Sequence, residues 1–437
     1  MEKNLELSGD TTSATVARGV DRGACLCLSG GGYRATLFHL GVLRRLNELG
    51  ILAKLSAITS VSGGSILNGL LASRWATLQV GQAGQFKNFV EQVARPMREF
   101  CGKDLRTKLL FGTRLKPTNW LAVARDWFSV SANYLAEAYE PLYDMRLDEL
   151  PAPGTGAPRF IFCSTNVGTG ACWHFHGGPN ARMGDFYTGY CEAKTTRISE
   201  AVAASSAFPP GFSALRLRRS GCGEFSRIDQ WGEERVSSTK REPLQGREIL
   251  LTDGGVYDNL GVEPVWRSYE VLLVSDAGRP FGSGDKMGQG IVTRLRRAAD
   301  ISMEQVAAVR KRWLVEQLTG GRRQGAIWTL HSRLDEFPHA EKVGYGRDAC
   351  AAVQGIRTDL DAFSDPEMAC LENHGYSMAD AAVRSFAPGL CSQPVAPYIW
   401  PYDDWRDEQR VCNSLAQSGR RRLARDVGRY LLRFGRQ

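Results

Sequence analysis

Two consecutive segments near the start of the chain share one pattern: a short apolar strand, a glycine-rich turn and a helix. The apolar run at 24–29 is followed by three glycines at 30–32, and the run at 55–61 by the Ser-Gly-Gly turn at 62–64. A short apolar run bounded by glycine is typical of a strand buried on both faces. Two such units in succession predict an α/β domain whose central sheet is mostly parallel.

The same alternation continues over most of the chain. Further strands are predicted at 159–164, 248–252, 271–275 and 326–331, and helices at 34–49, 65–75, 196–207 and 291–318. We find no internal repeat and no low-complexity linker between these segments. One large domain is therefore the economical interpretation of 437 residues.

The domain has boundaries that follow changes in composition. Residues 1–20 are predicted to be a flexible leader, 21–386 the main α/β domain, and 387–437 a basic helical extension. Within the main domain, 76–156 breaks the strand–helix rhythm and is expected to be a helical insertion. It either folds over a site as a lid or packs as ordinary helices. The polar stretch 217–246 is expected to be an exposed loop.

The composition narrows the class of protein. The chain carries 55 basic and 47 acidic residues, a formal charge of +8, which favours an anionic surface such as lipid headgroups. No apolar run approaches the length of a membrane-spanning helix, and the first twenty residues lack the apolar core of a secretory signal. The cysteine count is odd, at 11, without a CxxC pair, which favours reduced thiols in a cytoplasmic protein over disulfides or zinc.

The turn Ser60-Val61-Ser62-Gly63-Gly64 is the strongest local signal for chemistry. It joins an apolar strand to a helix, and a sharp turn of this kind pushes its central serine out at the carboxyl edge of the sheet. The helix that follows supplies free N–H groups and the positive end of its dipole. Ser62 is therefore a candidate nucleophile. The alternative is a glycine turn with a purely structural role.

The glycine loop 30–32 lies in the corresponding place of the first unit and is followed by Tyr33 and Arg34. Backbone N–H groups on such a loop point at an anion, and Arg34 adds a positive charge. One interpretation is a phosphate cradle for a nucleotide, although the loop fits only a loose variant of G-x-G-x-x-G. The other is an oxyanion hole for acyl transfer, which the nearby Ser62 turn favours.

A third turn, Asp253-Gly254-Gly255, directly follows the apolar run at 248–252. If this strand is parallel to the one before Ser62, its carboxylate lies on the same edge of the sheet. Asp253 is then a candidate general base for the Ser62 hydroxyl. The alternative is a turn aspartate that caps a loop. Asp258 is the rival acid.

Taken together, these motifs resemble those of the patatin-like phospholipase family. The matching segments are LSGGGYRATLFHLGVLRRL, ITSVSGGS, AVAASSAFPPGFSAL and LTDGGVYDNLGVEP, in the family's order, with ENHGYSMADAAV resembling its C-terminal helix. The resemblance covers most of 21–386 and leaves 76–156 unmatched. It implies a three-layer α/β/α fold and a Ser-Asp dyad without a catalytic histidine.

Carried over to this chain, the resemblance assigns Ser62 as nucleophile and Asp253 as its partner. It assigns the oxyanion N–H groups to the loop made of Gly30, Gly31 and Gly32, with Arg34 close by. Neither a metal nor a cofactor is implied.

Two positions depart from the family's elbow. Ser60 replaces its first glycine, and Gly63 stands where alanine is frequent. Because both residues are small, we expect the turn to survive.

The implied activity is hydrolysis of fatty-acyl esters in phospholipids or lysophospholipids. The same enzyme held silent until an activator binds, a non-catalytic lipid-binding module and a general esterase are the alternatives. For an activator, such as a nucleotide signal or a host protein, 278–289 and 291–318 are the places to look. Nucleic acid is not an expected partner.

The expected location is cytoplasmic, with peripheral contact to membranes. The arginine-rich tail 420–436 either forms a basic amphipathic helix on an anionic membrane or packs on the core as a final helix.

Overall fold

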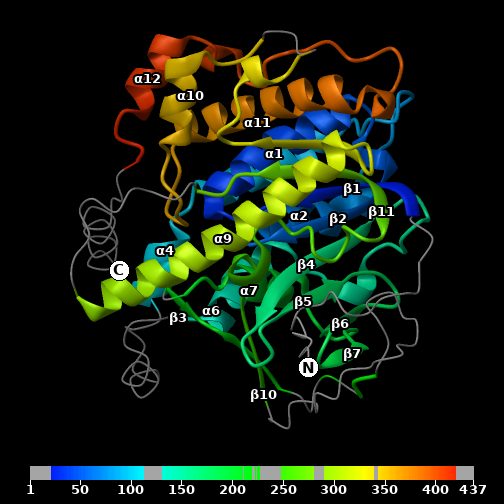
Figure 1. The fold of residues 1–437 in the computed structure, drawn as a ribbon, viewed down its shortest axis with the longest axis vertical. Coiled ribbons are helices and arrows are strands. Elements are labelled where there is room, and N and C mark those ends of the chain that lie inside the picture. The colour runs from blue at the N-terminus through cyan, green and yellow to red at the C-terminus, as the bar shows by residue number, and fades with distance from the viewer. Residues whose placement is uncertain are drawn as a thin grey trace, which may run out of the picture.

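A computed structural model describes residues 21–112, 130–209, 211–218, 222, 224–226, 248–279, 290–338 and 343–419. Its centre is a ten-stranded mixed sheet whose main path runs β12-β11-β1-β2-β4-β5-β6-β7 (Figure 1). The leader 1–20, the tail 420–436, most of 217–246 and most of 278–289 lie outside the described residues.

The sheet has a parallel half and an antiparallel half. The pairs from β12 through β11, β1 and β2 to β4 are parallel, as predicted for buried strands, whereas β5, β6 and β7 continue from β4 as an antiparallel meander. The strands are β1 (Asp21–Leu28), β2 (Leu55–Val61), β3 (Val130–Ser131), β4 (Arg159–Asn166), β5 (Ala171–His176), β6 (Arg182–Asp185), β7 (Gly189–Glu192), β8 (Phe212–Ser213), β9 (Leu215–Arg218), β10 (Glu248–Asp253), β11 (Tyr269–Asp276) and β12 (Gln324–Thr329).

Helices cover both faces of the sheet, which gives three layers. Alternate residues of β1 show this, because Leu26 and Leu28 enter one apolar cluster while Cys25 and Cys27 enter the other. The helices are α1 (Gly32–Glu48), α2 (Gly63–Arg74), α3 (Arg95–Cys101), α4 (Leu105–Gly112), α6 (Ala132–Tyr139), α7 (Ile198–Ser206), α8 (Gly255–Asp258), α9 (Ile291–Thr319), α10 (Arg347–Gln354), α11 (Asp365–Phe386) and α12 (Glu408–Leu415).

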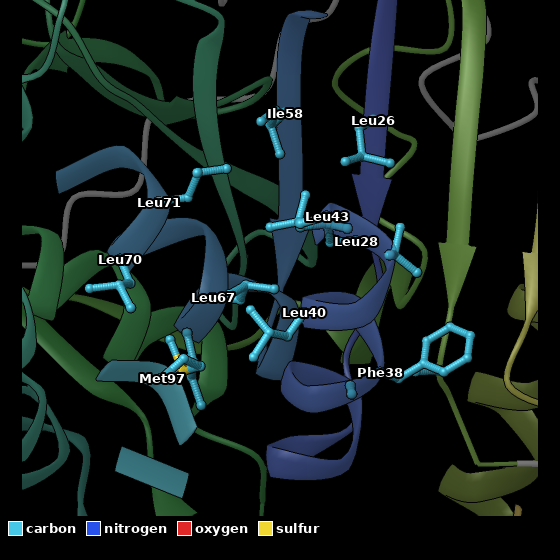
Figure 2. Packing of buried hydrophobic residues seen from close by; sticks show 14 of the residues in the cluster. Leu26, Leu28, Phe38, Leu40, Leu43, Ile58, Leu67, Leu70, Leu71 and Met97 are labelled. Atoms are coloured by element: carbon cyan, nitrogen blue, oxygen red, sulfur yellow. The ribbon is translucent and has the colours of Figure 1, made fainter. Parts of the chain in front are cut away.

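The larger cluster lies under α1, α2 and α11. Figure 2 shows Leu40 and Leu43 of α1 and Leu67 of α2 gathered beside Leu28 and Ile58 of the sheet. All of these side chains are fully buried. Since burial of one such side chain stabilises the fold by roughly 1.5–3 kcal/mol, this packing fixes both helices, and therefore the turns that begin them, against the strands.

The remaining predicted segments differ in how regular they are. Within 76–156 the described residues form short helices, α3, α4 and α6 among them, joined by irregular chain. The described part of 387–437 contains one α-helix, α12, and two short 3-10 helices, Pro388–Leu390 and Asp403–Trp405, joined by irregular chain. Within the described ranges, no helix has the length and apolar composition needed to cross a bilayer. The eleven cysteines form no disulfide.

Helices α1 and α11 cross at very close range because each has a glycine at the contact (Figure 1). A Cβ on Gly41 would lie 1.9 Å from the backbone oxygen of Glu372, and one on Gly375 would lie 2.0 Å from that of Phe38. Neither backbone oxygen can move without shifting its helix. The two glycines therefore set the distance between the helices.

We expect Gly41→Ala to lower the free energy of unfolding, measured by urea denaturation, by about 1–3 kcal/mol. The crowding outweighs the gain in helix propensity, which is about 1 kcal/mol. Gly389→Ala is the matched control, since a Cβ there meets no atom within 4 Å. Equal stabilities of the two variants would contradict this account of the crossing.

Candidate active site

Ser62 occupies a strained turn between β2 and α2. Its φ of 49° and ψ of −116° make it the one non-glycine residue with positive φ among the described residues. Such a conformation costs about 1–3 kcal/mol and persists only where the surroundings hold it. Here the N–H of Ser62 donates to Ser205 Oγ at 2.9 Å, and α2 begins at once with Gly63. The turn leaves the Ser62 side chain half-buried at the sheet edge.

Asp253 lies beside Ser62, but by a route that differs from the expected one. Strand β10 pairs with β4 in the antiparallel sense, so the condition of parallel strands is not met. Strand β4 extends beyond the end of β2, and β10 pairs with that extension on the same side. Val61 pairs with Cys163, and Asp253 pairs with the next residue, Ser164. The carboxyl ends of β2 and β10 therefore meet head to head.

The Asp253 carboxylate accepts hydrogen bonds from the Ser62 side chain and from the N–H of Gly255, the latter at 2.7 Å. The residue is only 2% exposed. Burial raises the pKa of Asp253 to about 7, although the two hydrogen bonds offset part of that shift. A carboxylate that binds and releases a proton near neutral pH, in contact with a serine hydroxyl, has the properties of a general base.

The glycine loop lies on the other side of Ser62, and its three glycines differ in role. The N–H of Gly30 donates to the backbone oxygen of Asn259 at 3.1 Å, so this N–H is not available to an oxyanion. The described residues provide no acceptor for the N–H groups of Gly31 and Gly32. Their φ angles of 145° and 59° turn the loop sharply into α1.

Close approach explains why glycines occupy the two loops. A Cβ on Gly63 would lie 2.2 Å from the oxygen of Gly32, and one on Gly64 would lie 2.5 Å from the oxygen of Leu28. A Cβ on Gly30 would lie 3.0 Å from the Cβ of Ser62. Only glycine lets the first turns of α1 and α2 meet, so the free N–H groups of the loop stay next to the serine.

Arg34 is not placed as the sequence analysis expected. Its guanidinium is 2% exposed and donates to the backbone oxygens of Ala277 and Ile356, at 3.0 and 3.1 Å. It turns away from the loop because these carbonyls lie behind it, and burial lowers its pKa to about 10. Arg34 therefore fixes the chain that flanks the loop instead of facing Ser62.

Buried hydroxyl groups form a hydrogen-bonded network next to the Ser62 turn. Most of them could not be identified from the sequence. Ser65 Oγ donates to Ser60 Oγ at 2.9 Å and bonds Ser205 Oγ at the same distance, and Ser205 Oγ donates to Cys163 O at 2.6 Å. Asn68 also donates to Ser60 Oγ. Ser60, where the family has glycine, is thus a partner in this network. Ser205 belongs to the AVAASSAF segment, which was noted only as a family match.

Asn259 is the second residue that was missed. Its backbone oxygen binds Gly30, and its Oδ1 would lie 2.5 Å and 2.7 Å from a Cβ on Gly30 and on Gly255. Gly254 is equally confined, because its Cβ would lie 2.4 Å from Cys163 O. The DGG turn and the glycine loop therefore share one contact residue.

The rival groups lie elsewhere. Asp258 accepts the N–H groups of Leu260 and Glu263, as a loop cap does. His39 is buried inside α1, where it bonds Ser275 Oγ and Ser29 O, and burial lowers its pKa to about 4. His174 bonds the hydroxyl of Tyr190, and His374 bonds the backbone oxygen of Leu330. Within the described ranges, no cluster of His, Cys, Asp or Glu has the arrangement of a metal site.

We expect the free energy of unfolding of Asp253→Asn to increase relative to that of the wild type as the pH rises. The carboxyl has a pKa near 3.8 when unfolded and about 7 when folded, so folding favours its protonated form. Its contribution to stability is complete below pH 4, is lost between pH 4 and 7, and is constant above 7. The full difference is on the order of 4 kcal/mol.

This difference is measured by urea denaturation of both proteins across that pH range. Glu372, whose pKa burial also raises to about 7, titrates in the same window, but it cancels because both proteins contain it. If the difference in free energy of unfolding between the two proteins does not change with pH, the pKa of Asp253 is not raised by folding.

Solved structures resemble the chain at low sequence identity. Among solved structures, human GIVD cytosolic phospholipase A2 is 12% identical, with a TM-score of 0.41, 92% of this chain covered and 64% of that one. VipD from Legionella pneumophila is 15% identical, with a TM-score of 0.32, 83% of this chain covered and 66% of that one. The chain thus spans slightly less than two thirds of their lengths. These scores are too low to carry an argument.

No curated protein matches the sequence. The model of the family described as "Patatin-like phospholipase" matches residues 26–266. This match spans more than half of the chain and contains the Ser62 elbow, the glycine loop and the DGG turn. The protein belongs to the patatin-like phospholipase family.

Proposed function

We propose that the protein is a lipid acyl hydrolase that cleaves fatty-acyl esters of phospholipids or lysophospholipids with a Ser62–Asp253 dyad. One observation carries the proposal: a serine on a strained elbow is hydrogen-bonded to a buried carboxylate whose pKa is about 7. A serine hydroxyl is a weak nucleophile unless a base of suitable pKa removes its proton. Membership of the family supports the choice of lipid esters as substrates.

The first half of the reaction forms an acyl-enzyme. Ser62 Oγ attacks the ester carbonyl carbon while its proton passes to the Asp253 carboxylate. The negative charge that develops on the carbonyl oxygen is stabilised by the N–H groups of Gly31 and Gly32, for which the described residues provide no acceptor. The tetrahedral intermediate then collapses, and Asp253 returns the proton to the leaving alcohol.

The second half releases the fatty acid. Asp253 accepts a proton from a water molecule, whose oxygen attacks the acyl carbon. Collapse of the second tetrahedral intermediate breaks the bond to Ser62 Oγ, which recovers its proton from Asp253. A single carboxylate therefore acts in turn as base and acid, which requires a pKa near the working pH. Neither Arg34 nor the N–H of Gly30 takes part in these steps.

We expect Ser62→Ala and Asp253→Asn to reduce fatty-acid release from mixed phospholipid vesicles by roughly a thousandfold or more. Ser73→Ala and Asp148→Asn are matched controls, because Ser73 bonds only Leu70 O and Asp148 pairs with Arg146 on the surface. Both controls should retain the wild-type rate. Release that survives Ser62→Ala would rule out this nucleophile.

The outcome also separates the alternatives. Release of acid only from soluble short-chain esters would indicate a general esterase. Inactivity of the folded wild type that cell extract relieves would indicate the activator-dependent form. Vesicle binding without any turnover would indicate a lipid-binding module.

The pH dependence gives a second test. Because Asp253 must be ionised to accept the proton, kcat/KM for an uncharged ester should rise with pH, with its midpoint near 7, and should level off above it. The measurement uses initial rates between pH 5 and 9. A midpoint near the ordinary aspartate pKa of about 4 would contradict the proposed environment of this base.

A further inference from the structure

Among the described residues, helix α9 contacts the rest of the protein through side chains in its C-terminal half. Leu314 is fully buried, and Trp313 packs edge-on against Trp266 with ring centroids 4.8 Å apart. Arg310 donates to the backbone oxygen of Tyr257 and to Glu263, at 2.9 and 2.8 Å. These contacts define the inward face of a helix that Figure 1 shows, in yellow-green, running diagonally across the front of the molecule.

Helix α9 also carries an apolar stripe whose side chains are exposed. Its members recur at steps of four, three, eight and three residues, which keeps them on one side of a helix with 3.6 residues per turn. They are Ile291, Leu295, Ala298, Val306 and Val309. Ile291 and Leu295 are each 66% exposed and Val309 is 54% exposed. The stripe is about 27 Å long at 1.5 Å per residue.

Basic side chains accompany this stripe. Arg294 and Arg312 are exposed, and neither has an acidic partner in the part of the chain that the structure describes. The acidic residues Asp300 and Glu304 are half-buried on the side toward the protein. The stripe is therefore apolar with a positive border, apart from Glu316 beyond its C-terminal end.

We propose that this stripe of α9, with its arginine border, is the surface by which the protein docks on an anionic lipid bilayer. The choice of partner rests on the proposed function. The stripe would enter the boundary between headgroups and acyl chains, and the arginines would contact anionic headgroups. An exposed apolar stripe bordered by arginines is unfavourable in water and is stabilised at the surface of an anionic membrane.

A second copy of the chain fits the same face less well. Pairing of two such faces would bring two arginines of each copy together without compensating carboxylates on the border. Five aliphatic side chains along one helix also provide far less than the ~800 Å² per partner of a stable protein interface. A bilayer has neither restriction.

Docking on this face would hold the active site near the lipid. Tyr257 and Glu263, which Arg310 binds, follow the Asp253 turn within ten residues, and Lys311 forms an ion pair with Asp276 next to the chain that flanks the glycine loop. The helix that touches the membrane is thus tied directly to the loops of the candidate site.

The test measures vesicle binding in the Ser62→Ala background, so that lipid is not consumed. Ile291→Asp with Leu295→Asp should weaken co-sedimentation with vesicles of equal parts phosphatidylcholine and phosphatidylglycerol roughly tenfold or more. Arg294→Glu with Arg312→Glu should weaken it to a similar extent, and the affinity of the parent should fall with salt.

Matched variants control for exposure and charge. Ile399→Asp changes an apolar residue that is 67% exposed, and Arg74→Glu with Arg347→Glu reverses two exposed charges elsewhere. These variants should bind vesicles as the parent does. Circular dichroism and thermal unfolding of every variant establish that it is folded.

Three results would overturn the proposal. The first is a folded parent that does not bind the anionic vesicles, and the second is binding that the α9 variants and the controls reduce equally. The third is a parent that is dimeric by light scattering and becomes monomeric with Leu295→Asp, which assigns the stripe to a second copy. Failure of the proposed function is separate, because it appears as absent fatty-acid release by the wild type.

Discussion

The candidate site depends on one pairing, that of β4 with two strands along the same edge. Strand β2 occupies the first part of this edge and β10 the rest, from opposite directions, so Ser62 and Asp253 end up facing each other. The Asp253 carboxylate is buried at this meeting point, and burial raises its pKa to about 7 although the hydrogen bond from Ser62 opposes the shift. A shift of one residue in the register of β10 would turn the Asp253 side chain to the opposite face of the sheet.

Much of this arrangement could be predicted from the sequence. The strand–glycine–helix units, the elbow and the DGG turn each have a local signature, and the predicted strands and helices lie close to where the apolar pattern placed them. The antiparallel strands β6 and β7 were not predicted. The direction of β10 could not be predicted, because an apolar run such as 248–252 carries no information about which strand it pairs with. Asp253 nevertheless lies beside Ser62, because the carboxyl ends of β2 and β10 also meet in the antiparallel arrangement.

The environments of Gly30 and Arg34 could not be predicted from the sequence for a related reason. Whether an N–H is free, or a guanidinium points at a site, depends on what packs behind it. Here the backbone oxygens of Asn259 and Ala277, more than two hundred residues away in the chain, take up those donors. Local patterns identify which residues carry chemistry, whereas long-range packing decides which of their atoms remain available for it.

The separation of Ser62 and Asp253 along the chain has a consequence for synthesis. The nucleophile and its turn lie in the first two βα units, but the base arrives on a strand made nearly two hundred residues later. Under the proposed mechanism, a partly made chain has a serine without a base. Because contacts of such long range form late, the newly made protein stays inert toward lipid until β10 has joined the sheet.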